Sequence, residues 1–262
     1  MGTSVVLLAA GYGTRLYPLT KHRPKALLPL GTGVMLDAIM QAVASIPEVG
    51  PIALVSNHQF FPQFQAWQQA QSSRLELIDD GTTSPEARLG AIRDLDLALE
   101  KIASSDDVVV LGTDNLFRWS LADFVAFAKT KRPASSVAIR EVSSLEEARR
   151  YGVVELDAQA RVVRCLEKPA QPPSRTIALC VYYFPGTIRD RIRAFMAGGG
   201  NVDAPGFFLE WLVRQDQVYG FVTKGEWFDI GSQEAYQQAL ARWAAHPSGT
   251  TSPKRTAHRR VV

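Results

Sequence analysis

The sequence predicts an α/β fold whose central sheet is mixed and mostly parallel, and three observations support this. Between residues 4 and 112, apolar runs typical of strands buried on both faces alternate with segments of helical periodicity. Such alternation implies right-handed crossovers between parallel strands. From residue 135 onward, strand-like runs follow one another directly, which predicts a β-rich second half. The chain has 262 residues, 46% of them hydrophobic, enough to form a sizeable core without disulfides or a structural metal.

The first half contains four predicted strands and three predicted helices between them. The pair Ser120 and Asp123 then predicts the N-terminal cap of a further helix. The predicted strands are Ser4 to Ala10, Ile52 to Asn57, Leu75 to Asp79 and Asp107 to Gly112. The helices are marked by Met35, Ile39, Val43 and Ile46, by Phe61, Phe64 and Trp67 within residues 59–71, and by Leu89, Ile92, Leu95, Leu99 and Ile102.

The second half begins with four strand-like runs, VAIREV, GVVELD, RVVRCLEK and IALCVYYF, with a hairpin turn expected at Asp157 to Ala160. Helices are expected around residues 187–196 and 204–214, a strand at Val218 to Thr223, and a last helix from Gln233 to Ala245. We expect residues 1–245 to form one domain.

The net charge of +3 comes from the end of the chain. Residues 246–262 contain Lys254, Arg255, Arg259 and Arg260 and no acid, which leaves 25 bases and 26 acids elsewhere. The segment is rich in Ser, Thr, Pro and Gly, so we predict a disordered basic tail and no nucleic-acid partner.

Cysteine content and hydropathy narrow the class of protein further. Cys165 and Cys180 lie in apolar runs and are expected to be small buried residues rather than a disulfide or zinc ligands. No apolar run is long enough for a membrane span, and none has a cationic lead-in like a signal peptide. A cytoplasmic protein that does not interact with membranes is therefore expected.

The turn after the first strand is the most informative segment. Gly11 and Gly13 lie where that strand ends, which is the ligand-binding edge of a parallel sheet. The dinucleotide pattern G-x-G-x-x-G is broken by Leu16, and no Gly-Lys-Ser/Thr follows as in a P-loop. A flexible turn followed by cations suits a polyphosphate, the alternative being a surface loop with solvated basic residues. The cations are Arg15, Lys21, Arg23 and Lys25.

These residues belong to a long motif, G-Y-G-T-R-L-Y-P-L-T followed by R-P-K-A-L-L-P-L, and further motifs accompany it. They are LGTDN (111–115), YGVVELD (151–157), EKP (167–169) and WFDIG (227–231). Together they resemble the signature of the sugar-1-phosphate nucleotidylyltransferases, in particular the thymidylyl and uridylyl enzymes. The resemblance implies a Rossmann-like three-layer sandwich in which residues 1–245 are the catalytic domain and the second half binds the sugar.

The resemblance also implies roles for the nucleotide-binding residues. The backbone of Leu8, Ala9, Ala10 and Gly11 would meet the base and ribose, while Gly13, Thr14 and Arg15 would cradle the triphosphate. Lys25 would reach the α-phosphate or the departing pyrophosphate, so Arg15 and Lys25 are the expected catalytic cations. Gly90, which we place inside an apolar helix, would approach the base or ribose, with tight helix packing as the alternative.

The acceptor and metal sites follow from the remaining motifs. The resemblance implies that Asp114 and Asp229 hold Mg²⁺, an ion that prefers oxygen ligands; alone, each would suit a helix cap or loop hydrogen bond. It also implies that Lys168 holds the phosphate of the sugar phosphate, Glu167 its hydroxyl groups and Gly152 its ring. An exposed ion pair is the alternative for Glu167 and Lys168.

Two departures from the family pattern bear on specificity. The segment Asp79 to Gly90 lacks the Gln that reads the pyrimidine in many thymidylyl members, so Asp80, Thr82, Thr83 and Arg88 remain candidates. Cys180 lies near a position where many members have a small glycine beside the sugar, which allows an unusual acceptor.

The sequence thus predicts Mg²⁺-assisted transfer of a nucleotidyl group from UTP or dTTP to a sugar-1-phosphate by a minimal transferase lacking the β-helix of longer members. A homo-oligomer is compatible with this. The alternatives are a cytidylyltransferase acting on a non-sugar phosphate or phosphonate, and a non-catalytic nucleotide-sugar-binding regulatory protein.

Overall fold

A computed structural model describes residues 2–71, 75–102 and 106–245, and it confirms the predicted α/β class with a mixed sheet. The parallel half contains β1 (Thr3–Leu8), β4 (Val49–Ser56), β5 (Glu76–Asp79) and β6 (Asp107–Gly112). In it, β1 pairs in parallel with β4 and β6, and β4 with β5. The carboxyl ends of these strands therefore meet at one edge.

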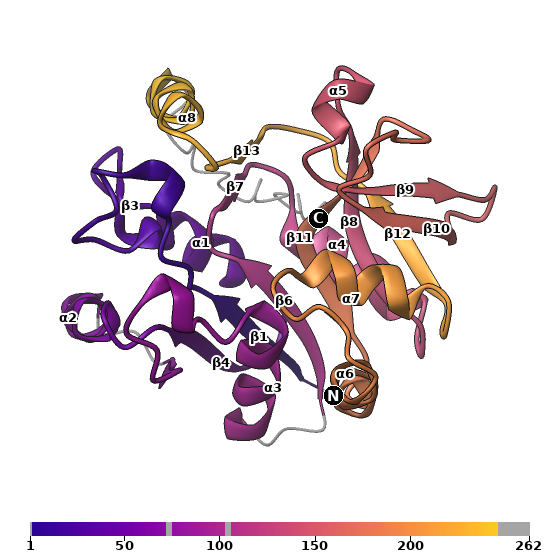
Figure 1. Ribbon diagram of the computed structural model, residues 1–262, viewed down its shortest axis with the longest axis horizontal. Coiled ribbons are helices and arrows are strands. Elements are labelled where there is room, and N and C mark those ends of the chain that lie inside the picture. Colours follow the sequence, from indigo (N-terminus) through magenta and orange to yellow (C-terminus); the bar gives the residue numbers. More distant parts are fainter. Residues whose placement is uncertain (1, 72–74, 103–105, 246–262) are drawn as a thin grey trace, which may run out of the picture.

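The strand-rich half is joined to the parallel half by β11, which runs antiparallel to β6. Its strands are β8 (Ser135–Glu141), β9 (Gly152–Leu156), β10 (Val162–Glu167), β11 (Thr176–Phe184) and β12 (Val218–Val222). The strand order is β10-β9-β11-β6-β1-β4-β5, and β8 pairs with both β11 and β12. Figure 1 shows the two halves side by side, with β1 and β4 on the left and β8 to β10 and β12 on the right.

Helices cover both faces of the sheet, because the apolar side chains of the doubly buried strands point to both sides. One core contains residues of α1 (Met35–Val43), α2 (Phe61–Gln71) and α4 (Leu121–Thr130). The opposite core contains residues of α3 (Ala91–Ile102), α6 (Ile188–Ala197) and α7 (Pro205–Leu212). A third cluster packs α8 (Gln233–Ala245) against the loop after β1.

Most predicted elements are confirmed, with shifts of a few residues at their ends. Ser120 caps α4 as expected, since its hydroxyl accepts from the Asp123 amide at 3.0 Å. The hairpin turn between β9 and β10 also forms, with the Asp157 amide donating to Arg161 O at 2.9 Å. Three short 3-10 helices were not predicted (Thr14–Leu16, Lys25–Leu27 and Pro85–Ala87). The short strands and α-helix not predicted are β2 (Pro29–Leu30), β3 (Gly33–Val34), β7 (Asn115–Phe117), β13 (Trp227–Asp229) and α5 (Leu145–Ala148).

The prediction that Gly90 lies inside a helix is wrong. The helix begins at Ala91, and Gly90 precedes it with φ of 92°, a conformation that favours glycine. A Cβ at Gly90 would lie 2.6 Å from Val202 O. Positive φ and close packing against residue 202 therefore both explain the glycine.

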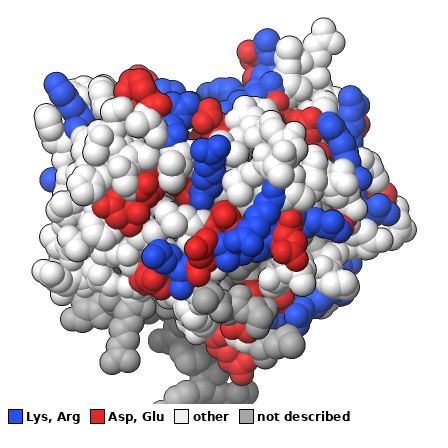
Figure 2. Space-filling model, turned by 60° about the horizontal axis from the view of Figure 1, so that its bottom comes forward, with Lys and Arg blue, Asp and Glu red and all other residues white. Residues whose placement is uncertain are grey.

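Surface charges on one face are interleaved rather than segregated. Figure 2 shows the face at the bottom of Figure 1, where basic and acidic side chains alternate. On α6, Arg189 pairs with Asp96 at 2.9 Å and with Glu100 at 2.6 Å, and Arg191 pairs with Asp216 at 2.7 Å. These two arginines are thus neutralised by neighbouring acids.

Three further predictions can be placed against the described residues. Cys165 is buried, Cys180 is half-buried, and both are free thiols. Within residues 2–71, 75–102 and 106–245, no helix combines the length and apolarity needed to cross a bilayer. The predicted disordered tail, residues 246–262, lies outside the described residues.

Candidate active site

The glycine turn leaves the sheet at the carboxyl end of β1. Gly13 has φ of 63°, and its carbonyl accepts from the Thr20 hydroxyl at 2.7 Å, which fixes the turn into the 3-10 helix Thr14–Leu16. Gly11 is exposed, and a Cβ there would meet nothing within 4 Å. The turn therefore presents open backbone to solvent beside the exposed Arg15, as an anion site requires.

Neighbouring strands hold the backbone of this turn in place. The Leu8 carbonyl accepts from the Thr113 hydroxyl at 2.9 Å, and the Ala10 carbonyl from the Asn57 amide at 2.9 Å. The Ala9 amide donates to Val55 O at 2.9 Å. Residues 8–10, which the resemblance assigns to the base and ribose, are thus anchored between β4 and β6.

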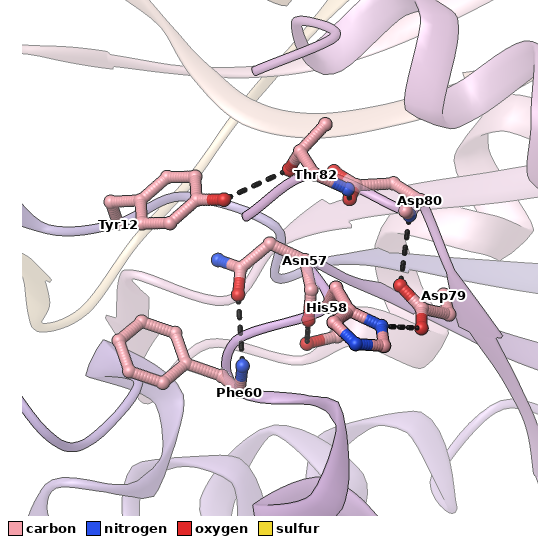
Figure 3. Close-up of polar contacts among 9 residues, drawn as sticks. Tyr12, Asn57, His58, Phe60, Asp79, Asp80 and Thr82 are labelled. Carbon is pink, nitrogen blue, oxygen red and sulfur yellow. Dashed lines mark hydrogen bonds and ion pairs between the residues drawn. The ribbon is translucent and has the colours of Figure 1, made fainter. Parts of the chain in front are cut away.

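A polar cluster at the ends of β4 and β5 supports the same turn (Figure 3). Tyr12 points toward Thr82, and their hydroxyl oxygens are 3.0 Å apart. Asn57 also accepts from the Phe60 amide at 3.0 Å, so it anchors the start of the segment leading into α2 as well as Ala10. His58 Nδ1 lies 2.6 Å from Asp79 Oδ2. The cluster connects the loop after β5 to the glycine turn.

The four candidates for reading the base now differ in their surroundings. Thr83 is exposed, Arg88 is exposed and pairs with Asp203 at 3.0 Å, and the Thr82 hydroxyl is bonded to Tyr12. One Asp80 oxygen accepts from the Thr82 amide at 2.7 Å; the other is buried without a hydrogen-bond partner among the described residues. Burial, the largest cause, raises the pKa of Asp80, and Asp79 adds to this effect.

Lys25 and Asp114 meet at the centre of the site. Lys25 Nζ lies 3.1 Å from Asp114 Oδ2, with the Lys25 side chain 14% exposed and that of Asp114 38% exposed. Burial opposes ionisation of Asp114, but the Lys25 ammonium and the Asn115 amide outweigh it, so the pKa of Asp114 lies below its usual value. A cation from the signature loop is therefore placed against the acid that follows β6.

A hydrogen-bond chain orients the Asp114 carboxylate. Trp227 Nε1 donates to Asn115 Oδ1 at 2.8 Å, and Asn115 Nδ2 donates to Asp114 Oδ1 at 2.9 Å. Pairing of β7 with β13 aligns Asp229 with Asn115, and the Ile230 amide donates to Asp114 O at 3.0 Å. The motifs LGTDN and WFDIG thus form one unit.

Asp229 lies close enough to Asp114 for their charges to interact. Burial, the largest cause, and the Asp114 charge both raise the pKa of Asp229; Lys25, Arg15 and a hydrogen bond from the Tyr151 hydroxyl partly offset this. Two neighbouring carboxylates that oppose each other's ionisation are an oxygen donor set suited to Mg²⁺. The residues present therefore fit the predicted ion, although the described residues contain no group of three or more potential ligands.

The expected sugar-phosphate residues lie together on β9 and β10. Glu167 faces Gly152 across the strand pair, and its carboxylate is 3.0 Å from where a Gly152 Cβ would be. Glu167 is 6% exposed, and Lys168 Nζ lies 3.7 Å from its Oε1, with the Lys168 side chain 57% exposed. Burial raises the pKa of Glu167 despite the Lys168 charge, so this is not a simple exposed ion pair.

Cys180 lies between the acceptor and metal residues. Its Sγ is 2.8 Å from the position of a Gly112 Cβ, and Asp114 Oδ1 is 3.1 Å from that same point. Burial raises the pKa of the Cys180 thiol, and Asp114, Glu167 and Asp229 raise it further. Those three carboxylates therefore all lie near enough to Cys180 on β11 for their charges to act on it. Gly90, expected near the base or ribose, is the remaining predicted site residue. The requirement for glycine there is explained by its positive φ and its packing against Val202.

Sequence reasoning gave no role to several residues that shape the site. Tyr151, Trp227 and Thr113 lie within the motifs YGVVELD, WFDIG and LGTDN. Asn57 and Thr113 directly follow strands, which is a usable signal for polar groups at a sheet edge. Tyr12 lies within the long motif, but the motif does not indicate its partner Thr82, which is 70 residues away.

Comparison with known proteins agrees with this geometry. The model of the family described as nucleotidyl transferase matches residues 4–245. The mannose-1-phosphate guanylyltransferase catalytic subunit beta of Drosophila melanogaster is 27% identical over 256 residues, covering 97% of this chain and 66% of that relative. The low-salt glycan biosynthesis nucleotidyltransferase Agl11 of Haloferax volcanii is 25% identical over 263 residues, covering 98% and 71%. The chain thus spans about two thirds of the length of these relatives.

Solved structures share the fold at lower identity. A protein described as a glucose-1-phosphate thymidylyltransferase from Bacillus anthracis, in complex with sucrose, superposes with a TM-score of 0.80 at 20% identity, covering 92% of this chain and 95% of that one. A UDP-glucose pyrophosphorylase complexed with UDP-glucose gives 0.78 at 20% identity, covering 94% and 99%. With the family model matched across residues 4–245 and the motifs assembled at one edge of the sheet, the resemblance is confirmed: the chain belongs to the nucleotidyl transferase family and is akin to its sugar-1-phosphate nucleotidylyltransferases.

Proposed function

We propose that this protein transfers a nucleotidyl group from a nucleoside triphosphate to a sugar-1-phosphate, producing a nucleotide sugar and pyrophosphate. The observation that carries the proposal is the contact of Lys25 with Asp114, next to Asp229 and the glycine turn. This contact joins the signature loop to the two carboxylates. The catalytic domain would be residues 1–245, and the cytoplasm its location.

In the proposed reaction, a phosphate oxygen of the sugar-1-phosphate attacks the α-phosphorus of the triphosphate. A new phosphorus–oxygen bond forms as the bond between the α-phosphorus and the bridging oxygen breaks, and pyrophosphate leaves. The attacking phosphate is already anionic, so no general base is required and the rate depends on positioning and charge neutralisation. Arg15 and Lys25 would neutralise the triphosphate, with Gly13 and Thr14 supporting it.

Asp114 and Asp229 would hold Mg²⁺. Bound there, the ion would neutralise phosphate oxygens and help orient the triphosphate. The chain from Trp227 through Asn115 to Asp114 would keep one carboxylate oriented for this role.

The nucleotide would lie over residues 8–11, with Gly90 near the base or ribose, and the sugar phosphate against Gly152, Glu167 and Lys168. The sequence favours UTP or dTTP, whereas the Drosophila relative is named as a guanylyltransferase. The test therefore has to include all common triphosphates.

The experiment is a pyrophosphate-release screen of ATP, GTP, CTP, UTP and dTTP against glucose-1-phosphate, mannose-1-phosphate and other sugar-1-phosphates, with Mg²⁺ and with EDTA. At least one pair should release pyrophosphate only with Mg²⁺, and Asp114→Asn should abolish this release without changing the folded circular-dichroism spectrum. Exposed Asp123 provides a matched control, Asp123→Asn, which should retain activity. The proposed function is wrong if no pair reacts above background, and the metal assignment is wrong if Asp114→Asn turns over normally.

A further inference from the structure

The Glu167 carboxylate occupies a slot between two glycines from different elements. Gly152 on β9 lies on one side, where a Cβ would be 3.0 Å from Oε2. Gly206, in the first turn of α7, lies on the other side, where a Cβ would be 2.5 Å from Glu167 Cδ and would overlap Oε2. Any side chain at residue 206 would therefore displace the carboxylate.

The backbone of Glu167 is tied to the same helix. Its amide donates to Glu210 Oε2 at 2.9 Å, and the other Glu210 oxygen accepts from Arg214 at 2.6 Å. Helix α7 therefore accepts a hydrogen bond from the backbone of Glu167 through Glu210, and it borders the Glu167 carboxylate at Gly206. Both interactions fix the position of Glu167.

Small residues lie between this slot and the surroundings of Asp114. Gly152 pairs with Ala178 on β11, and a Gly152 Cβ would lie 3.8 Å from Ala178 Cβ. Two residues further along β11, Cys180 lies beside Gly112, where Asp114 Oδ1 is also close. Glu167 and Asp114 thus lie at opposite ends of a stretch with few bulky side chains.

We infer that Gly206 is a positioning residue for the acceptor: it keeps the Glu167 carboxylate recessed beside Gly152, where it accepts hydrogen bonds from the hydroxyl groups of a sugar phosphate. The inference rests on the proposed function. It gives α7 an indirect part in acceptor recognition. Gly206 acts by leaving space for the Glu167 carboxylate, without contacting the acceptor itself. The chemical class favoured is a phosphate ester with free hydroxyls, over an ester such as methyl phosphate that lacks them.

Replacement of Gly206 by alanine should leave the fold intact. The three heavy atoms nearest to the added Cβ all belong to the carboxyl group at the flexible end of Glu167. Alanine is also favoured over glycine within a helix by about 1 kcal/mol. The variant therefore displaces the carboxylate without removing any group that contacts the triphosphate.

The test measures steady-state kinetics of the full chain with the triphosphate and sugar-1-phosphate pair found active in the screen. Gly206→Ala should raise the KM of the sugar phosphate at least about tenfold, the effect of losing one charge-assisted hydrogen bond. The kcat and the KM of the triphosphate should stay within about twofold of the wild type, which is the deviation expected when a substitution does not interact with a distant site. Gly198→Ala, at the end of α6 where an added Cβ has only ordinary contacts at 3.4 Å and beyond, is the matched control and should match the wild type.

A double substitution separates positioning from a general structural effect. In a Glu167→Ala background there is no carboxylate to displace, so adding Gly206→Ala should change neither KM nor kcat. Transfer to methyl phosphate should be equally slow in the wild type and in Gly206→Ala. The inference is overturned if Gly206→Ala keeps the wild-type KM, if it lowers kcat and both affinities together, or if its effect persists without Glu167. Absence of activity in the wild type would instead refute the proposed function.

Discussion

Asp94 is a buried acid that the proposed chemistry does not use, and its titration should make the stability of the protein depend on pH. The residue lies in α3, is 5% exposed, and has one carboxylate oxygen without a hydrogen-bond partner among the described residues. Burial, the largest cause, raises its pKa to about 7 from the usual 3.8, and the nearby charge of Asp80 contributes. Asp94 is therefore neutral in the folded protein below pH 7.

The sign and size of the effect follow from this difference. Between pH 4 and pH 7 the folded chain retains a proton that the unfolded chain has lost, so the free energy of unfolding falls as pH rises through this window and levels off above it. The pKa of Asp94 rises from 3.8 to about 7 on folding. At 1.36 kcal/mol for each pKa unit, this shift contributes at most about 4 kcal/mol to the free energy of unfolding. Asp94→Asn is close in shape and cannot ionise, so it should remove the effect.

The assay is urea denaturation of the wild type and Asp94→Asn at pH 4.5 and at pH 8. The two proteins should have similar stability at pH 4.5, and the variant should be more stable at pH 8, with a higher urea midpoint. In parallel thermal melts at pH 8, its melting temperature should rise by about 2–4 °C for each kcal/mol. Exposed Asp190 offers a matched control, because Asp190→Asn changes charge by the same amount on an open surface. If Asp94→Asn were equally destabilised at both pH values, Asp94 would be charged and paired in the folded protein, and the reasoning would be refuted.

Two further substitutions test the site and the start of α3. Trp227→Phe keeps an aromatic ring but removes the hydrogen-bond donor to Asn115. The kcat should fall about two- to tenfold, the effect of losing one net hydrogen bond, while both KM values stay near those of the wild type. A change confined to one KM would show that Trp227 contacts a substrate instead of orienting Asp114. Gly90→Ala should lower stability by more than about 1 kcal/mol in thermal melts, because of the positive φ and the Val202 carbonyl 2.6 Å from the added Cβ; unchanged stability would contradict the packing explanation.

The strands were predictable because most of them are continuous apolar runs, a pattern that burial on both faces requires. The error at Gly90 arose because periodicity alone counted Leu89 as the first helical position, while the backbone of Gly90 and its packing against residue 202 delay the helix. The strands β7 and β13 have three residues each, too few to show a period of two. They are nonetheless the elements that align Asp229 with Asn115.

The site was predictable to the extent that its residues lie in contiguous motifs. Signature residues placed Lys25 and Asp114 in the same site although 89 residues separate them. What sequence reasoning could not supply were partners outside the motifs, such as Thr82 for Tyr12 and Asn57 for the Ala10 carbonyl. These contacts depend on which loops meet at the sheet edge, and local patterns carry no information about that.

The topology explains why transfer is expected at Asp114 rather than elsewhere along the edge. Its strand, β6, is bordered by β1 on the parallel side and by β11 on the antiparallel side. Residues proposed to hold the triphosphate follow β1, whereas those proposed to hold the acceptor lie on β9 and β10, beyond β11. An acid at the end of β6 would therefore lie between the two proposed substrate sites, and Lys25, reaching in from the signature loop, would neutralise charge at the α-phosphate under attack. A carboxylate at the end of β4 or β5 would lie near the proposed nucleotide site but farther from the proposed acceptor site.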